Sequence, residues 1–166
     1  MKITVDRRSG FCTGVVKAVE KAEKQLENSG TLYSLGKIVH NTEEIRRLAD
    51  MGLKTLTYDE FRVLKNATVL IRAHGEPPLT FEIAKQNNIQ LIDATCPVVM
   101  RLQQKISEKH EEIAGEGGLV LIFGKKDHPE VRALVGQTNG DACVVREPGE
   151  LDEMKLNRQI ALYSQT

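Results

Sequence analysis

Apolar residues recur along the chain in two alternating patterns, one typical of helices and the other of short buried strands. Residues 14–26 place apolar side chains at positions 15, 16, 19, 22 and 26, the spacing of one helix face. Leu119–Phe123 is an unbroken apolar run, typical of a parallel strand buried on both faces. The pattern predicts strands at residues 2–5, 32–35, 54–57, 68–71, 90–92, 119–123, 143–145 and 159–163. It predicts helices at residues 14–26, 43–51, 58–64, 78–87, 97–114, 130–135 and 148–155.

This alternation predicts the fold class. Strands that alternate with helices form βαβ units, in which neighbouring strands run parallel. We therefore expect an α/β fold of small parallel sheets flanked by helices. The 166 residues suffice for one domain or for two small lobes.

Composition excludes several classes of protein. The 23 basic and 23 acidic residues give no net charge, and aromatic residues make up 4%, which argues against nucleic-acid binding. No apolar run approaches the roughly 20 residues that cross a bilayer. The first residues carry charges where a signal peptide is apolar. We expect a soluble cytoplasmic protein that contacts neither nucleic acid nor membrane, and its three cysteines indicate free thiols or metal ligands rather than disulfides.

Residues able to do chemistry gather after the predicted strands, where open parallel sheets bind their ligands. The set comprises Cys12, His40, His74, Cys96, His128, Glu130 and Thr166. His110, within a charged helix, is expected to be a solvated surface residue, and Cys143, within a strand, a small buried thiol. Each member of the set has an ordinary structural explanation when taken singly, such as a buried thiol or a helix cap. Their concentration at one sheet edge favours a functional site.

The types of residue in this set indicate which kinds of site they could form. Cys12 and Cys96 are too far apart in sequence for a C-x-x-C zinc or redox motif. Thiolates at helix starts can hold an iron–sulfur cluster, although two ligands are too few for a stable four-iron cluster. Histidines beside glycine-containing turns and helix amino ends suit a phosphate or diphosphate. Glu130 and Thr166 add a proton donor and a hydroxyl relay.

Six motifs occur in a specific order across nearly the whole chain. They are RSGFCTGV (8–15), IVHN (38–41), AHGEP (73–77), DATCP (93–97), DHPEV (127–131) and SQT (164–166). With these motifs the sequence resembles the 4-hydroxy-3-methylbut-2-enyl diphosphate reductase family of the non-mevalonate isoprenoid pathway. The cysteine motifs GFC and DATCP are the most specific part of the resemblance.

The resemblance implies a role for each member of the set. It implies cluster ligation by Cys12 and Cys96, substrate binding by His40, His74, His128 and Thr166, and catalysis by Glu130 and Thr166. The implied cofactor is a [4Fe-4S] cluster whose fourth iron is open and acts as a Lewis acid. The implied reaction is reductive dehydroxylation of the isoprenoid diphosphate to isopentenyl and dimethylallyl diphosphate. A ferredoxin- or flavodoxin-type carrier is the implied electron donor.

The resemblance also implies a division into lobes. The family has three α/β lobes, and the third supplies the third cysteine ligand. Residues 1–95 are then the first lobe and residues 96–166 the second, which we expect to be incomplete at its C-terminal end. We expect the third lobe and its cysteine to be absent from this chain, and Cys143 lies outside the family's ligand motifs.

Three hypotheses about function remain open at the level of sequence. The first is the reductase, with this chain as part of a larger enzyme. The second is a non-catalytic fragment that binds a diphosphate without a stable cluster. The third is a thiol-dependent enzyme in which Cys12 or Cys96 acts as a nucleophile.

Overall fold

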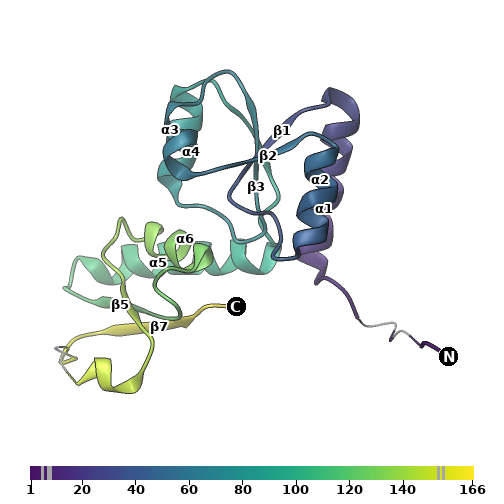
Figure 1. Cartoon of the computed structure of the whole chain (residues 1–166). Coiled ribbons are helices and arrows are strands. Elements are labelled where there is room, and N and C mark those ends of the chain that lie inside the picture. Colours follow the sequence, from purple (N-terminus) through teal and green to yellow (C-terminus); the bar gives the residue numbers. More distant parts are fainter. Residues whose placement is uncertain (5, 7–8, 153, 155) are drawn as a thin grey trace.

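Two separate parallel sheets organise the molecule. A computed structural model describes residues 1–4, 6, 9–152, 154 and 156–166. One sheet has four strands in the order β2-β1-β3-β4 and the other has three in the order β6-β5-β7. Every neighbouring pair is parallel, and helices flank both sheets (Figure 1). The predicted α/β class is confirmed, while the division of the chain at residues 95 and 96 stays a prediction.

The first sheet contains β1 (Leu32–Leu35), β2 (Leu53–Leu56), β3 (Thr68–Ile71) and β4 (Gln90–Asp93). Its helices are α1 (Thr13–Ser29), α2 (Thr42–Asp50), α3 (Tyr58–Val63) and α4 (Pro78–Gln86). The second sheet contains β5 (Leu119–Phe123), β6 (Cys143–Val145) and β7 (Ile160–Ser164). It is accompanied by α5 (Pro97–Ala114), α6 (Pro129–Gly136) and the 3-10 helix η1 (Pro148–Leu151).

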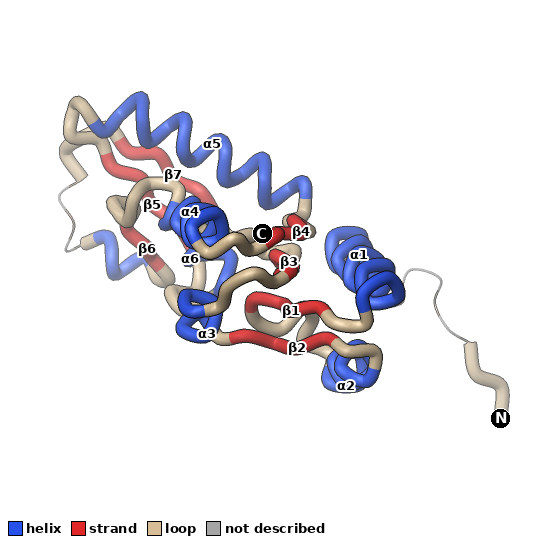
Figure 2. Tube along the Cα trace, turned by 90° about the horizontal axis from the view of Figure 1, so that it is seen from above, coloured by secondary structure: helices blue, strands red, loops and turns tan. Residues whose placement is uncertain are grey.

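Helices cover both faces of the first sheet. The apolar face of α1, including Ala22 and Leu26, packs with Leu70 of β3 in one buried cluster to which α2 also contributes. Phe61 of α3 and Ala84 of α4 belong to a second cluster on the opposite face. The view from above shows α1 and α2 on one side of the strands and α3 and α4 on the other (Figure 2). Burial on both faces explains why β3 is apolar throughout its last three residues.

The second sheet is covered mainly on one face. Ile106 of α5 and Leu134 of α6 pack on Val120 and Ile122 of β5. A smaller cluster containing Leu121 lies on the other face. The predicted burial of β5 on both faces is confirmed for residues 119–122, whereas Phe123, at the strand end, is 51% exposed.

Three predictions from sequence are wrong in detail. Residues 2–4 form no strand, because no described strand pairs with them, and residue 5 lies outside the described residues. The predicted helix at 148–155 is a 3-10 turn over Pro148–Leu151, since Gly149 disfavours an α-helix; residues 153 and 155 are outside the described part. His110 is not solvated: its side chain is 14% exposed and its Nε2 lies 3.1 Å from Asp141 Oδ2.

No helix in the described ranges is both long enough and apolar enough to cross a membrane.

Candidate functional site

Each sheet has one point at which the strand order reverses, and predicted site residues lie at both points. β2 and β3 lie on opposite sides of β1, and β6 and β7 lie on opposite sides of β5. At such a reversal the connections leave the sheet in opposite directions, and a ligand crevice opens beyond the carboxyl ends of the strands. His40 follows β1 and His74 follows β3, while His128 follows β5 and Thr166 follows β7.

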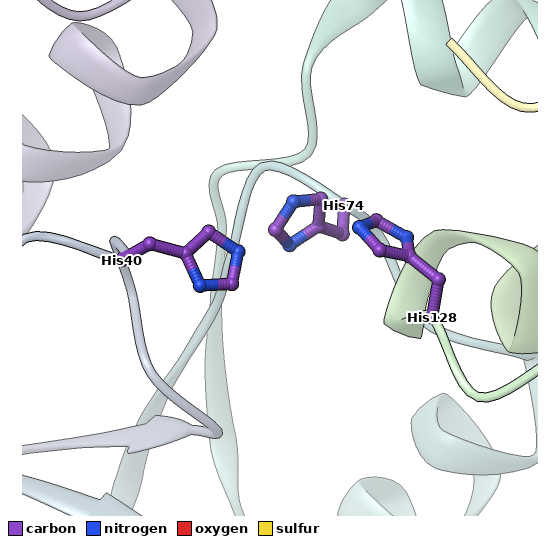
Figure 3. Close-up of side chains that lie close together, drawn as sticks. All are labelled: His40, His74 and His128. Atoms are coloured by element: carbon purple, nitrogen blue, oxygen red, sulfur yellow. The ribbon is translucent and has the colours of Figure 1, made fainter. Parts of the chain in front are cut away.

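Three imidazole rings meet where the segments after β1, β3 and β5 come together. The rings of His40, His74 and His128 lie side by side in the close-up view (Figure 3). The ring centroids of His40 and His74 are 6.1 Å apart. Those of His74 and His128 are 5.1 Å apart in an edge-on arrangement. One nitrogen of each ring lies within 4.8 Å of a nitrogen of the other two. Because His128 follows β5, both sheets contribute to this histidine cluster.

His74 is held as a neutral ring. Its burial is the main cause that lowers its pKa from 6.5 to about 4, and the positive charge of Arg72 and the neighbouring imidazoles act in the same direction. Its Nδ1 atom is buried, and no described protein atom forms a hydrogen bond with it. A buried polar atom without a protein partner indicates a place for a ligand atom or a water.

His128 has a defined tautomer. It is the N-cap of α6, and its Nδ1 accepts a hydrogen bond of 3.2 Å from the backbone N–H of Glu130. Since Nδ1 is the acceptor, the neutral ring carries its proton on Nε2 and presents an N–H donor there. Burial is the largest cause that lowers the pKa of His128, against the opposing effect of the Glu130 carboxylate.

Glu130 is joined to the end of the chain. Its side chain is buried, with the residue only 2% exposed. Oε1 accepts a hydrogen bond of 2.8 Å from the Thr166 backbone N–H, and Oε2 accepts one of 2.9 Å from the Thr166 hydroxyl. Gln165 Oε1 accepts from the backbone N–H of Lys125, which fastens the same two segments beside this pair. The two residues predicted to be catalytic are therefore in direct contact.

The two predicted cysteine ligands lie at neighbouring helix starts. Cys12 is the N-cap of α1 and Cys96 is the N-cap of α5, and neither side chain makes a capping hydrogen bond. A Cβ added to Gly14 would lie 3.0 Å from Cys96 Sγ, so the first turn of α1 contacts Cys96. Both thiols are free. Cys143 packs instead at the hydrophobic cluster on the far face of the second sheet.

Sequence reasoning missed how the second cysteine is positioned. The backbone N–H and the hydroxyl of Thr95 both donate to Asp93 Oδ1, over 2.8 and 2.5 Å. The Cys96 N–H donates to the Ala73 carbonyl over 2.9 Å, which ties the cysteine segment to the residue before His74. The available signal was the Asp-x-Thr spacing, a pattern in which an Asp side chain closes a turn.

The histidine cluster can bind an anion through N–H groups or a transition metal through nitrogen lone pairs. Nitrogens on one tetrahedral zinc ion lie roughly 3.3 Å apart, so the three rings would have to close further around a metal. The proton on His128 Nε2 presents a donor rather than a lone pair. Arg72 and Lys125 add positive charge close enough to lower histidine pKa values. These features favour an anion.

The comparisons with known proteins identify the family of the chain. A family model described as LytB protein matches residues 3–166. The chain belongs to the LytB family. It is 51% identical over its whole length to a 4-hydroxy-3-methylbut-2-enyl diphosphate reductase of Bacteroides thetaiotaomicron, of which it covers 57%. A reductase of the same name from Chloroherpeton thalassium is also 51% identical, and the chain covers 53% of it.

Two solved LytB-type structures share the fold. The structure of the E-1-hydroxy-2-methyl-but-2-enyl-4-diphosphate reductase from Plasmodium falciparum superposes with a TM-score of 0.85 at 29% identity, over 96% of this chain and 50% of that one. A structure of (E)-4-hydroxy-3-methyl-but-2-enyl diphosphate reductase, named as the terminal enzyme of the non-mevalonate pathway, gives 0.80 at 34% identity, over 99% of this chain and 58% of that one. The chain thus spans little more than half the length of the LytB relatives it matches.

Proposed function

We propose that this chain supplies part of a 4-hydroxy-3-methylbut-2-enyl diphosphate reductase. The observation that carries the proposal is the meeting of His40, His74 and His128, which follow strands of both sheets. His128 lies two positions before Glu130, whose carboxylate contacts Thr166. Membership of the LytB family and the names of the relatives support it. The reaction replaces a C–OH bond by a C–H bond and releases water, which consumes two electrons and two protons.

The histidine cluster is proposed to bind the diphosphate. His128 offers its Nε2 proton, and the unpartnered Nδ1 of His74 lies in the same cluster. Neutral imidazoles donate hydrogen bonds without the cost of burying a positive charge in the empty site. A bound polyanion then raises the histidine pKa values and draws protons into the complex.

Glu130 and Thr166 are proposed to handle the proton. The Thr166 hydroxyl lies 2.9 Å from Glu130 Oε2, so it can pass a proton between that carboxyl group and an oxygen of the substrate. The backbone N–H of Thr166 holds the other carboxylate oxygen, which fixes the direction in which Oε2 faces. Protonating a hydroxyl leaving group turns it into water, which departs more easily than hydroxide.

Cys12 and Cys96 are proposed to hold an iron–sulfur cluster. The two thiols fit such a group because they lie at the amino ends of touching helices, where the helix dipole favours thiolate, and because neither is used as a cap. When bound, a [4Fe-4S] cluster with an open iron would pass on two electrons, one at a time, from an external donor and would act as a Lewis acid. A third cysteine would come from the length that the relatives have and this chain does not span. A ferredoxin- or flavodoxin-type donor and a cytoplasmic location belong to the same proposal.

The decisive experiment uses a protein that contains these 166 residues and the remaining length of its relatives, prepared without oxygen. We expect brown absorbance and conversion of the hydroxylated diphosphate to isopentenyl and dimethylallyl diphosphate with a chemical reductant. C12S and C96S should lose both the absorbance and the turnover, whereas C143S should keep both. A colourless and inactive wild-type protein would contradict the proposal.

For the 166-residue chain by itself, diphosphate binding without a stable cluster is the second candidate. The specific observation in its favour is that the three histidines converge with no contribution from a cysteine. Titration of dimethylallyl diphosphate into the chain in the presence of an iron chelator should give saturable binding. A matched titration with His40→Gln should show at least tenfold weaker binding, about 1.4 kcal/mol. Binding that needs added iron would rule out this candidate.

A further inference from the structure

A cavity lies between the loops of the first sheet and α6, and its lining includes Arg72 and Pro129, close in sequence to His74 and His128. Its volume is about 540 Å³, and its lining comes from the loops after β1, β2 and β3 and from the first turn of α6. None of His40, His74 and His128 lines it. The cavity is therefore distinct from the proposed diphosphate site, although it too is formed by both sheets.

The lining carries an excess of positive charge. Lys37, Arg72 and Arg132 face it together with a single carboxylate, that of Glu76. Lys37 follows β1, Arg72 follows β3 and Arg132 lies on α6, so the three cations come from separate segments. Three positive charges against one negative charge leave a field that favours an anion.

Arg72 is buried yet incompletely paired. Its residue is 9% exposed, and its closest carboxylate oxygen is Glu76 Oε1 at 3.5 Å, a long separation for an ion pair. Its Nε is buried and has no hydrogen-bond partner among the described atoms. Gly36 admits the guanidinium against the backbone, since a Cβ there would lie 2.5 Å from Arg72 Nη1. A buried guanidinium is costly unless its donors are used, and the unpartnered Nε and the long contact to Glu76 leave Arg72 with capacity for a further anionic partner.

The rest of the cavity wall is apolar. Leu35, Leu56, Tyr58, Pro77 and Pro129 contribute to it. The Tyr58 hydroxyl lies 3.0 Å from Thr80 Oγ1, so the polar end of the ring is already satisfied, and the Arg62 guanidinium lies over the ring at 5.1 Å from its centroid. A cavity that has cations in one part and apolar walls elsewhere matches a ligand that has an anionic group and an apolar body.

We propose that this cavity binds an amphipathic organic anion, a phosphate or carboxylate on an apolar body, with the anionic group between Arg72 and Arg132. This binding site takes part in no step of the proposed reduction, and the proposal does not depend on that reaction. A ligand in this cavity can still affect the histidine cluster, because Arg72 is two positions from His74 and its charge contributes to the low pKa of that ring. An anion on Arg72 would partly cancel that charge as seen by the histidine cluster.

Phenyl phosphate is a suitable probe, measured by calorimetry and by shifts of backbone amide resonances in the 166-residue chain. We expect saturable binding with the largest shifts around Gly36 and Arg132, and at least tenfold weaker binding of inorganic phosphate and of phenol. Arg132→Gln, at an exposed helix position, should weaken the binding of phenyl phosphate about tenfold. Thr55→Tyr should abolish binding by filling the cavity without removing a charge.

Two further variants separate this site from its alternatives. Arg46→Gln removes an exposed guanidinium of α2 that pairs with nearby Glu43, and this variant should leave binding unchanged. His40→Gln removes a ring of the proposed diphosphate site, and it should weaken phenyl phosphate binding less than Arg132→Gln does. Affinity that falls in His40→Gln and persists in Arg132→Gln would overturn the proposal, because the anion would then occupy the histidine cluster. Equal binding of inorganic phosphate and phenyl phosphate would overturn the amphipathic character of the ligand.

Discussion

Both carboxylate oxygens of Glu130 accept hydrogen bonds from Thr166, a residue 36 positions later in the chain. Glu130 belongs to the first turn of α6, and its own backbone N–H donates to His128 Nδ1. Glu130 thus binds the capping ring of His128 through its backbone, which fixes the tautomer of that ring, and binds the segment after β7 through its side chain. The first turn of α6 therefore positions both the proposed proton donor, Glu130, and the proposed hydrogen-bond donor to the anion, His128.

Thr166→Ala should lower the free energy of unfolding by about 1 kcal/mol, because a buried carboxylate oxygen loses its hydroxyl donor while the backbone N–H donor remains. Urea denaturation measures the change. Thr166→Ser keeps the hydroxyl and should restore most of the stability. An alanine variant as stable as the parent would mean that the hydroxyl contact contributes nothing in solution.

Glu130→Gln should preserve the fold while removing the carboxyl group that is proposed to donate a proton to the substrate. The glutamine oxygen can accept from the Thr166 N–H, and its amide can donate to the Thr166 hydroxyl oxygen, so both contacts survive with one reversed. In the complete reductase, kcat should fall by roughly 10²- to 10⁴-fold with little change in KM, measured by steady-state kinetics. A rise in KM with kcat unchanged would assign Glu130 to binding.

His128→Asn and His128→Ala form a matched pair. Asparagine is a good N-cap and should keep the stability of α6, whereas alanine should cost about 1 kcal/mol of unfolding free energy. Both variants lose the imidazole and should bind dimethylallyl diphosphate at least fivefold more weakly, or about 1 kcal/mol. Denaturation and calorimetry on the same samples separate the two effects. Full affinity in the asparagine variant would remove His128 from the diphosphate site.

Acid should destabilise the protein through His74. Its pKa is lowered from 6.5 to about 4 by burial, by Arg72 and by the rings of His128 and His40. Between these two pH values the unfolded chain binds a proton that the folded chain does not, so the contribution of the neutral ring is present above pH 6.5 and is lost as the pH falls toward 4. His128, whose pKa is also lowered, acts in the same direction.

The measurement is the melting temperature from pH 7 to pH 4, which should fall by a few degrees more in the parent than in His74→Gln. The same linkage has the opposite consequence for the ligand. Binding of a diphosphate raises the histidine pKa values, so affinity should increase as the pH falls from 8 to 6, by at most about tenfold per pH unit for each proton taken up. Affinity that decreases over this range would indicate a metal-type site instead.

Gly136→Ala should destabilise the junction between α6 and the N-terminal end of α4. A Cβ at this last residue of α6 would lie 2.3 Å from Pro77 Cβ, at the N-cap of α4. Alanine in a helix normally gains up to about 1 kcal/mol over glycine, but here we expect a loss of about 1–3 kcal/mol from overpacking. Gly115→Ala is the control, because nothing lies within 4 Å of its added Cβ. Equal effects of the two substitutions would show that the junction yields without cost.

Local sequence patterns predicted most of the secondary structure. Helix periodicity in residues 14–26 corresponds to the buried face of α1, and the apolar run at 119–123 corresponds to β5. The errors lie where a local signal lacked support from the rest of the fold. Residues 2–4 have strand-like composition but no pairing partner, and His110 has a charged neighbourhood in sequence but pairs with Asp141 from another segment.

By itself, the sequence determined that the chain is α/β and that histidines, cysteines and a glutamate follow its strands, because both features depend on short-range spacing. Only the tertiary structure decided which of these residues meet. The order of strands within a sheet is selected by burial of apolar faces between segments far apart in sequence, and that order places His40 beside His74. The packing of α6 on the second sheet and against Pro77 then adds His128 and orients Glu130 toward Thr166. The burial of Arg72 likewise depends on a residue far away in the sequence, since its guanidinium packs against the backbone of Gly36.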